Sequence, residues 1–117
     1  MGHRGDPIRS TAVVDPEAPA RTWTLDEANA ALGEISEVVR RAMEATDRST
    51  LLAAVETLAA QGVLLRDHRT GLIDFAARAP SGRPFWLCWM WGEPEIDTWH
   101  WVEDGFAGRT PVSEPPS

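Results

Sequence analysis

The hydrophobic pattern of this 117-residue chain changes its period at Gly62, and that change limits the possible folds. Before Gly62, apolar residues recur at steps of three and four, whereas after it they tend to alternate with polar ones. The first pattern lines one face of a helix, and the second lines one face of a strand. The sequence therefore predicts helices followed by strands, which is an α+β arrangement.

Two helices are predicted before the change of period. Thr24 and Glu27 have the spacing of a capping box, and the first helix is expected to begin there. Asp47 or Ser49 is expected to cap the second helix. The apolar stripe of the first helix is Leu25, Ala28, Leu32, Ile35, Val39 and Ala42. Because the link between the two is short, we predict an antiparallel helical hairpin.

Four strands are predicted after the helices, at residues 63–66, 72–77, 85–91 and 96–102. The expected fold is an N-terminal antiparallel helical hairpin packed on one face of a four-stranded antiparallel β-meander. A single hairpin covers only one face of such a sheet. The other face is expected to meet water, a ligand or a second subunit.

A chain of this length is expected to form one domain, which we assign to residues 21–109. Residues 1–20 contain prolines and scattered charge without a sustained period, so they are predicted to be a flexible arm. The Pro- and Ser-rich residues 110–117 are predicted to be a flexible tail.

Composition narrows the possible partners. A formal net charge of −7 argues against nucleic acid and against anionic membranes, because both require a basic surface. One cysteine cannot form an internal disulfide. The sequence has no apolar run near the roughly 20 residues of a membrane span, and no signal-peptide pattern at its start. A cytoplasmic protein without a membrane partner is therefore expected.

The last predicted hairpin contains five of the six tryptophans and the single cysteine. If its turn is residues 92–95, Leu87 lies opposite His100 and Trp86 lies opposite Trp101. The face predicted to meet the helices then carries Phe85, Leu87, Trp89, Trp91, Ile96, Thr98, His100 and Val102. The other face carries Trp86, Cys88, Met90, Asp97, Trp99 and Trp101.

This second face is too apolar to remain in water without a reason. One hypothesis is a homodimer in which two such faces pack together. A second is a small-molecule pocket lined by indoles, and it is compatible with the first because pockets often lie between subunits. A third is a metal or haem site, and a fourth is a surface for a different protein.

His100 is the candidate general acid or base of such a pocket, with Glu93 or Glu95 as its charged partner. The same histidine also fits a metal ligand or a hydrogen-bonded core residue. The predicted ligand-binding residues are Trp86, Cys88, Trp89, Trp91, Trp99, Trp101 and Arg109, of which Arg109 would bind an anionic group.

The sequence does not identify a cofactor. The cysteine and histidine spacings match none of the usual zinc motifs. A metal ion or haem bound through His100 or Cys88 is therefore an alternative and not the leading hypothesis. Cys88 also fits an inert buried thiol. Asp74 interrupts an otherwise apolar strand and is therefore expected to lie on a wet face or to pair with an arginine.

Several motifs occur together in a recognisable order: residues 23–29 (WTLDEAN), 71–75 (GLIDF), 87–89 (LCW), 92–93 (GE), Ile96, 99–100 (WH) and 105–109 (GFAGR). They resemble a family of small bacterial proteins known as domain of unknown function 2203. The resemblance implies a shared α+β domain and no particular reaction. Ala76 departs from an expected proline, and the tryptophans at 86, 91 and 101 are extra.

The leading hypothesis is a small-molecule-binding protein, extending to a small enzyme of specialised metabolism in which His100 transfers a proton. Its rival is a homodimeric interaction module without catalysis.

Overall fold

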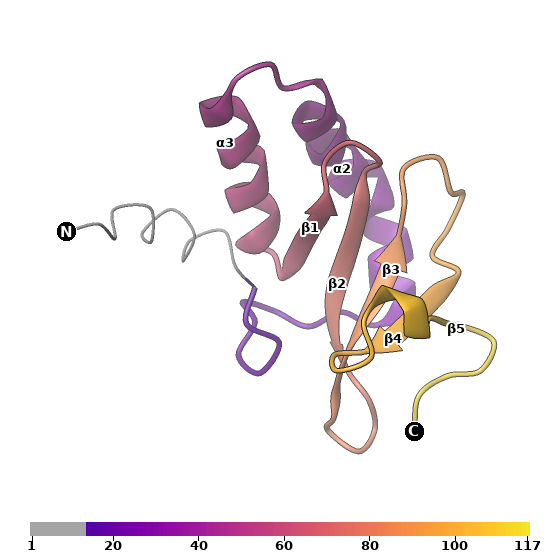
Figure 1. The fold of residues 1–117 in the computed structure, drawn as a ribbon. Coiled ribbons are helices and arrows are strands. Elements are labelled where there is room, and N and C mark those ends of the chain that lie inside the picture. Colours follow the sequence, from indigo (N-terminus) through magenta and orange to yellow (C-terminus); the bar gives the residue numbers. More distant parts are fainter. Residues whose placement is uncertain (1–13) are drawn as a thin grey trace.

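The computed structural model describes residues 14–117, so the predicted arm lies outside the described residues as far as residue 13. Over the described range, two α-helices precede an antiparallel sheet (Figure 1). The helices are α2 (Leu25–Glu44) and α3 (Arg48–Ala59). The strands are β1 (Val63–Asp67), β2 (Leu72–Arg78), β3 (Pro84–Trp89), β4 (Thr98–Trp101) and β5 (Thr110–Pro111), with the short 3-10 helix η2 (Phe106–Gly108) between the last two. The predicted α+β class is confirmed.

Both predicted helix starts are confirmed by their hydrogen bonds. The Thr24 hydroxyl accepts from the backbone N–H of Glu27, and the Glu27 carboxylate accepts from the N–H of Thr24, which completes the capping box. Asp47 caps α3 by accepting from the N–H of Thr50 at 2.8 Å. These contacts are local in sequence, which explains why the spacing alone predicts them.

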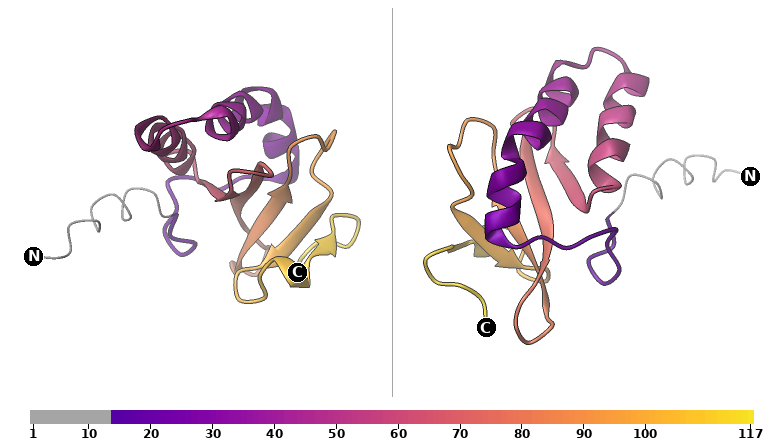
Figure 2. Two further views of the ribbon diagram at one scale, coloured as in Figure 1. Left: turned by 45° about the horizontal axis from the view of Figure 1, so that its top comes forward. Right: turned by 180° about the vertical axis from the view of Figure 1, so that it is seen from behind.

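The helices cover one face of the sheet, here called the helix-side face (Figure 2). The main core lies between the helices and the sheet. It contains Ile35 and Val39 of α2, Leu58 of α3 and Phe75 of β2, each 0–1% exposed. The opposite face of the sheet, called the outer face, carries Asp74, Ala76, Trp86, Cys88 and His100. The helical hairpin is therefore packed on one face of the meander, as expected.

The strand order is β1-β2-β3-β4-β5, so the sheet has one strand more than the four predicted. The extra strand comes from the segment expected to be a flexible tail. Thr110 pairs with Trp99, and the indole N–H of Trp99 donates to the carbonyl of Glu114 at 2.9 Å. A strand of two residues is too short to show an alternation of apolar and polar residues in the sequence. Only its pairing with β4 identifies it as a strand.

The register predicted for the last hairpin is wrong by one residue. Trp86 lies opposite His100 and Leu87 lies opposite Trp99. A shift of one residue moves every side chain of a strand to the other face. His100 is therefore on the outer face, and Trp99 and Trp101 pack against the helix-side core.

The shift arises because the strands are joined by residues 90–97 and not by a four-residue turn. Three side chains organise this loop. The Glu93 carboxylate accepts from the N–H of Met90 at 2.9 Å, and the Trp89 indole donates to the Glu93 carbonyl at 3.0 Å. Asn29 of α2 accepts from the N–H of Ile96 at 2.8 Å. The loop is thus tied to α2, and pairing resumes at Thr98.

Replacing Asn29 by alanine is expected to lower the free energy of unfolding by about 2 kcal/mol, because it leaves the N–H of the buried Ile96 without its acceptor. Ser36→Ala is the matched control. It removes an exposed hydroxyl from the same helix and should change stability by no more than about 0.5 kcal/mol. Urea unfolding curves of the two variants measure the difference, and equal midpoints would disprove the role of Asn29.

The outer face is covered mainly by the chain itself. Val14, Ala76 and Trp86 form a second buried cluster, against which Ala59, Leu64 and Val102 pack. Trp86 is 2% exposed. The expectation that Trp86, Trp99 and Trp101 lie on an uncovered face is therefore wrong. Of these three, only Trp86 is on the outer face, and it is already buried.

None of the helices in residues 14–117 combines the length and the apolar character that crossing a membrane requires.

Candidate functional site

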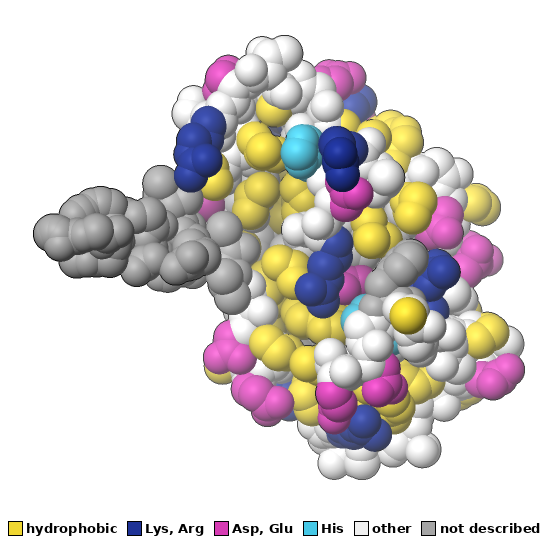
Figure 3. Space-filling model, in the orientation of Figure 1, with side chains coloured by type: hydrophobic (Ala, Val, Ile, Leu, Met, Phe, Trp, Pro, Cys, Tyr) yellow, Lys and Arg dark blue, Asp and Glu magenta, His cyan; other side chains and the backbone are white. Residues whose placement is uncertain are grey.

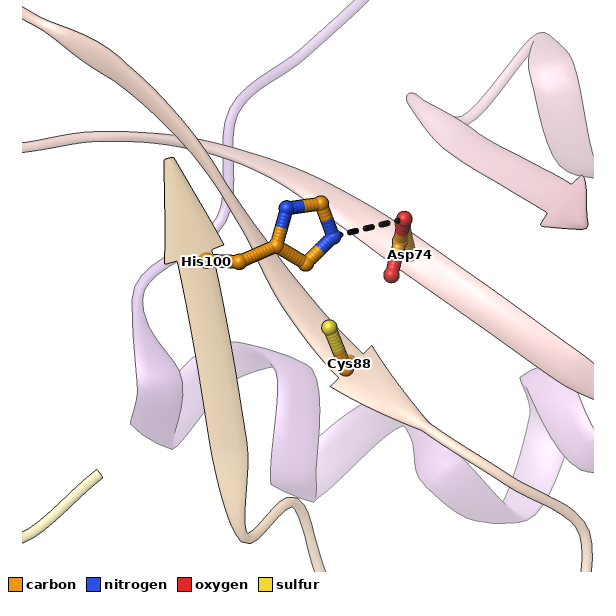
Figure 4. A group of neighbouring side chains, drawn as sticks. All are labelled: Asp74, Cys88 and His100. Carbon is orange, nitrogen blue, oxygen red and sulfur yellow. Dashed lines mark hydrogen bonds and ion pairs between the residues drawn. The ribbon is translucent and has the colours of Figure 1, made fainter. Parts of the chain in front are cut away.

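The outer face brings together three side chains with chemically useful atoms: Asp74, Cys88 and His100. They come from β2, β3 and β4, which are neighbours in the sheet. Asp74 and Cys88 are direct cross-strand partners. His100 is the cross-strand partner of Trp86, which precedes Cys88 by two residues and so points to the same face of the sheet. One carboxylate oxygen, the sulfur and one ring nitrogen all lie within 4.8 Å of one another. Figure 4 shows the three side chains directed toward a common space.

All three residues are buried, with 1–2% of their surface exposed. Their shared environment includes Arg66 of β1, whose Nε donates to Asp74 Oδ2 at 2.7 Å. The Arg66 guanidinium also lies over the Trp86 ring, 5.3 Å from its centroid. In Figure 3 a basic side chain crosses the middle of this face, beside acidic and histidine atoms. Of the two alternatives expected for Asp74, a wet face or an arginine partner, the structure shows the arginine partner.

His100 uses both of its ring nitrogens. Nδ1 lies 2.8 Å from the carbonyl oxygen of Trp101, and Nε2 lies 3.3 Å from Asp74 Oδ2. Because a carbonyl only accepts, Nδ1 must carry a hydrogen and donate it. The ring orientation is therefore set by the backbone of its own strand, and Nε2 is directed at the carboxylate.

The pKa values of Asp74 and His100 move apart. Burial has the largest single effect and would raise the pKa of Asp74, but its hydrogen bonds to His100 and Arg66 and the charge of Arg66 outweigh it, so that pKa lies below 3.8. Burial likewise would lower the pKa of His100. Its bonds to Asp74 and to the Trp101 carbonyl prevail, and the pKa lies above 6.5. The pair therefore favours a carboxylate facing an imidazolium.

Burial raises the pKa of the Cys88 thiol well above its usual range, and the charge of Asp74 and a hydrogen bond to its carboxylate raise it further. The Thr98 hydroxyl and the charge of Arg109 lower it, but by less. The sulfur is consequently a neutral thiol, which is the inert form, unless another cation reaches it.

A groove of about 280 Å³ opens on the other side of the sheet, where α2 begins. We call it the helix-side groove. It is lined by Trp23, Thr24, Leu25, Arg78, Ala79, Pro80, Phe85, Leu87, Trp99, Val112, Pro115 and Pro116. Most of these side chains are apolar. Because β4 alternates, the groove meets Trp99 and lies on the opposite face from His100.

The structure separates the residues that the sequence suggested for one site. Trp99 lines the helix-side groove, Trp86 and Cys88 are buried on the outer face, and Trp89 is in the main core. Trp91 lies at the hairpin tip with 39% of its surface exposed. Trp101 is half-buried, with the Arg83 guanidinium 3.8 Å from its ring centroid.

The charged residues predicted for the site also divide. Asp74 is the carboxylate that meets His100, in the place expected for Glu93 or Glu95. Glu93 holds the loop backbone through Met90, and Glu95 is exposed. Arg109 is exposed to solvent, but it is near enough to Cys88 for its positive charge to lower the pKa of the thiol. Sequence reasoning missed Arg66, because only the pairing of β1 with β2 brings it to Asp74.

A comparison with protein families matches residues 41–112, more than half of the chain, to the uncharacterized conserved protein DUF2203. The chain belongs to this family. The DUF2203 match includes Arg66, Asp74, Cys88 and His100, whereas Trp23 and Thr24 of the groove precede it. No curated protein matches this DUF2203 chain, and no solved structure matches it. The family description names no activity, so function has to be argued from the geometry.

Proposed function

We propose that this chain is a small-molecule-binding protein whose ligand occupies the helix-side groove. The observation that carries the proposal is the lining of the groove, in which two indole rings and one phenyl ring surround a space of about 280 Å³. Ligand pockets are typically lined by aromatic and apolar side chains, and they start near 300 Å³. The groove therefore suits a compact ligand.

The aromatic walls are held in place before any ligand arrives. The Trp23 indole donates to the Gln61 carbonyl at 2.9 Å, and the Trp99 indole donates to the Glu114 carbonyl. Phe85 meets Trp99 edge to face, with ring centroids 5.5 Å apart. Rigid walls of this kind reduce the entropy lost on binding.

The polar groups at the groove are few and already engaged. Arg78 donates to the carbonyls of Glu17 and Gly82, and Thr24 caps α2. The ligand is consequently expected to carry little charge and to be either a planar aromatic molecule or a small aliphatic one. The proposal assigns His100 no proton transfer in the groove, since that ring lies on the outer face.

The rival proposal, a homodimeric module, has less support. It requires a broad apolar surface, but among the side chains whose exposure the structure describes, Trp91 is the only large hydrophobic one that is exposed. Four of the five tryptophans of the last hairpin are buried or half-buried within one chain.

Indole is a suitable probe, because it is small, planar and apolar. In a titration followed by amide and indole N–H chemical shifts, the signals of Leu87, Trp99 and Trp23 are expected to move together and to saturate. Val112→Trp should abolish the shifts by filling the groove from the C-terminal segment. Ser113→Trp is the matched control, since it adds the same ring at an exposed position that does not line the groove.

Shifts that stay absent at saturating indole, or that persist unchanged in Val112→Trp, would disprove the groove as the binding site. Sedimentation velocity of the wild-type chain tests the rival directly, since a monomer at high concentration excludes the dimer.

A further inference from the structure

The space between Asp74 and His100 poses a problem of hydrogen-bond chemistry. Nδ1 of His100 donates its hydrogen to the Trp101 carbonyl. In the neutral ring Nε2 then has a lone pair and no hydrogen, and that lone pair faces Asp74 Oδ2 at 3.3 Å. Two acceptors do not face each other at this distance unless a positive charge lies between them, and the Arg66 guanidinium bonds to Oδ2 alone. Either a proton or a metal ion satisfies the requirement.

The second oxygen of the same carboxylate points to the metal ion. Asp74 is only 1% exposed, and within residues 14–117 its Oδ1 accepts no hydrogen bond of good geometry, although the Cys88 thiol is near enough to the carboxylate to act on its pKa. Buried polar atoms are nearly always partnered, and an unpartnered one needs an explanation. A proton on His100 would satisfy Oδ2 and leave Oδ1 with only the weakly donating Cys88 thiol beside it.

The third donor is the sulfur of Cys88, which lies within 4.8 Å of one carboxylate oxygen of Asp74 and one ring nitrogen of His100. We propose that Asp74 Oδ1, Cys88 Sγ and His100 Nε2 bind one Zn²⁺ ion on the outer face. A set of one oxygen, one sulfur and one imidazole nitrogen suits this borderline-soft ion better than Mg²⁺ or Ca²⁺, which prefer oxygen. Three protein ligands also leave a fourth position for water.

The surrounding groups hold the ligands as outer-shell groups do in zinc proteins. A metal-binding histidine usually donates its other N–H to a carbonyl or carboxylate, as His100 does to Trp101. Ligating carboxylates are in turn hydrogen-bonded, as Asp74 is through Oδ2 to Arg66. Arg66 thereby occupies one oxygen and leaves the other for the ion.

Zn²⁺ binds thiolate and neutral imidazole, so the proton of Cys88 Sγ and any proton on His100 Nε2 pass to the solvent when the ion enters.

Cobalt is the best probe, because Co²⁺ occupies zinc sites and a thiolate bound to it absorbs strongly in the near ultraviolet. Since Cys88 is the only cysteine, this band reports that residue without any variant. For the reduced full chain, freed of metal by a chelator, we expect the band to saturate at one Co²⁺ per chain. One equivalent of Zn²⁺ should then abolish it.

Variants identify the other two ligands. Asp74→Asn and His100→Gln should weaken Zn²⁺ binding by at least about 100-fold, more than the loss of an outer-shell group does. His3→Gln and His68→Gln, which change the other two histidines, are the controls and should bind as the wild type does. Near-ultraviolet circular dichroism shows whether each variant is folded.

Absence of the band at millimolar Co²⁺ would overturn the proposal and leave the proton as the cation in the cluster, whatever the variants do. Zn²⁺ binding that persists in Cys88→Ser and His100→Gln but is lost in His3→Gln or His68→Gln would also overturn it, since the ion would then be bound elsewhere.

Discussion

Replacing Asp74 by asparagine is expected to lower the free energy of unfolding by about 3 kcal/mol in buffer that contains a metal chelator. Removing one partner of a buried ion pair leaves the other charge uncompensated, which typically costs about 3–5 kcal/mol. The side chain of Arg66 is 40% exposed and can turn to water, so the lower end of that range applies. His100 is buried and has no such escape.

The pH dependence separates this effect from a simple packing defect. The pKa of Asp74 is lowered in the folded protein, so its contribution is present above the ordinary value of 3.8 and is lost as pH falls through the folded value. The pKa of His100 is raised, so its contribution is complete below 6.5 and is lost as pH rises through the folded value. The difference between wild type and Asp74→Asn should therefore be largest between about pH 4 and pH 6.5.

Asp97→Asn is the matched control, because Asp97 is exposed in the loop before β4. It should change the free energy of unfolding by less than about 0.5 kcal/mol at every pH. Urea unfolding at pH 5.5 and pH 8.5 measures both variants. An Asp74→Asn effect that is small at pH 5.5, or that is larger at pH 8.5 than at pH 5.5, would contradict the ion pair with His100.

Replacing Gly62 by alanine is expected to lower the free energy of unfolding by about 3 kcal/mol or more. Gly62 has a φ of 72°, a left-handed conformation that costs a residue with a Cβ about 1–2 kcal/mol. An added Cβ would also collide with the backbone carbonyl of Arg21. Backbone cannot move aside as a flexible side chain can, so the overlap adds roughly 1–3 kcal/mol.

Gly82→Ala isolates the collision from the conformational cost. Gly82 also has a positive φ, 89°, but an added Cβ would meet nothing within 4 Å. We expect its cost to stay at about 1–2 kcal/mol. Thermal unfolding of both variants gives the difference, and midpoints within a degree of each other would show that the segment at Arg21 yields to the new methyl group.

The predicted site shows where sequence reasoning is strong and where it fails. Asp74 stood out because a carboxylate within an apolar strand needs a partner, and the structure supplies Arg66. His100 and Cys88 were identified by residue type, but they were assigned to opposite faces of the sheet. Their meeting with Asp74 follows from the pairing of β2, β3 and β4, which the spacing of residues along the chain does not reveal.

The sequence by itself determined the local features: both helix caps, the first amphipathic stripe, the change to strands at Gly62 and the α+β class. Each depends on residues a few positions apart, whose interactions are nearly independent of the rest of the fold. The tertiary structure alone decided the fifth strand, the face on which each tryptophan lies and the partner of His100. The alternation of side chains along a strand does not say which set faces the helices. That assignment depends on the residue at which pairing resumes after the loop that Glu93 and Asn29 hold.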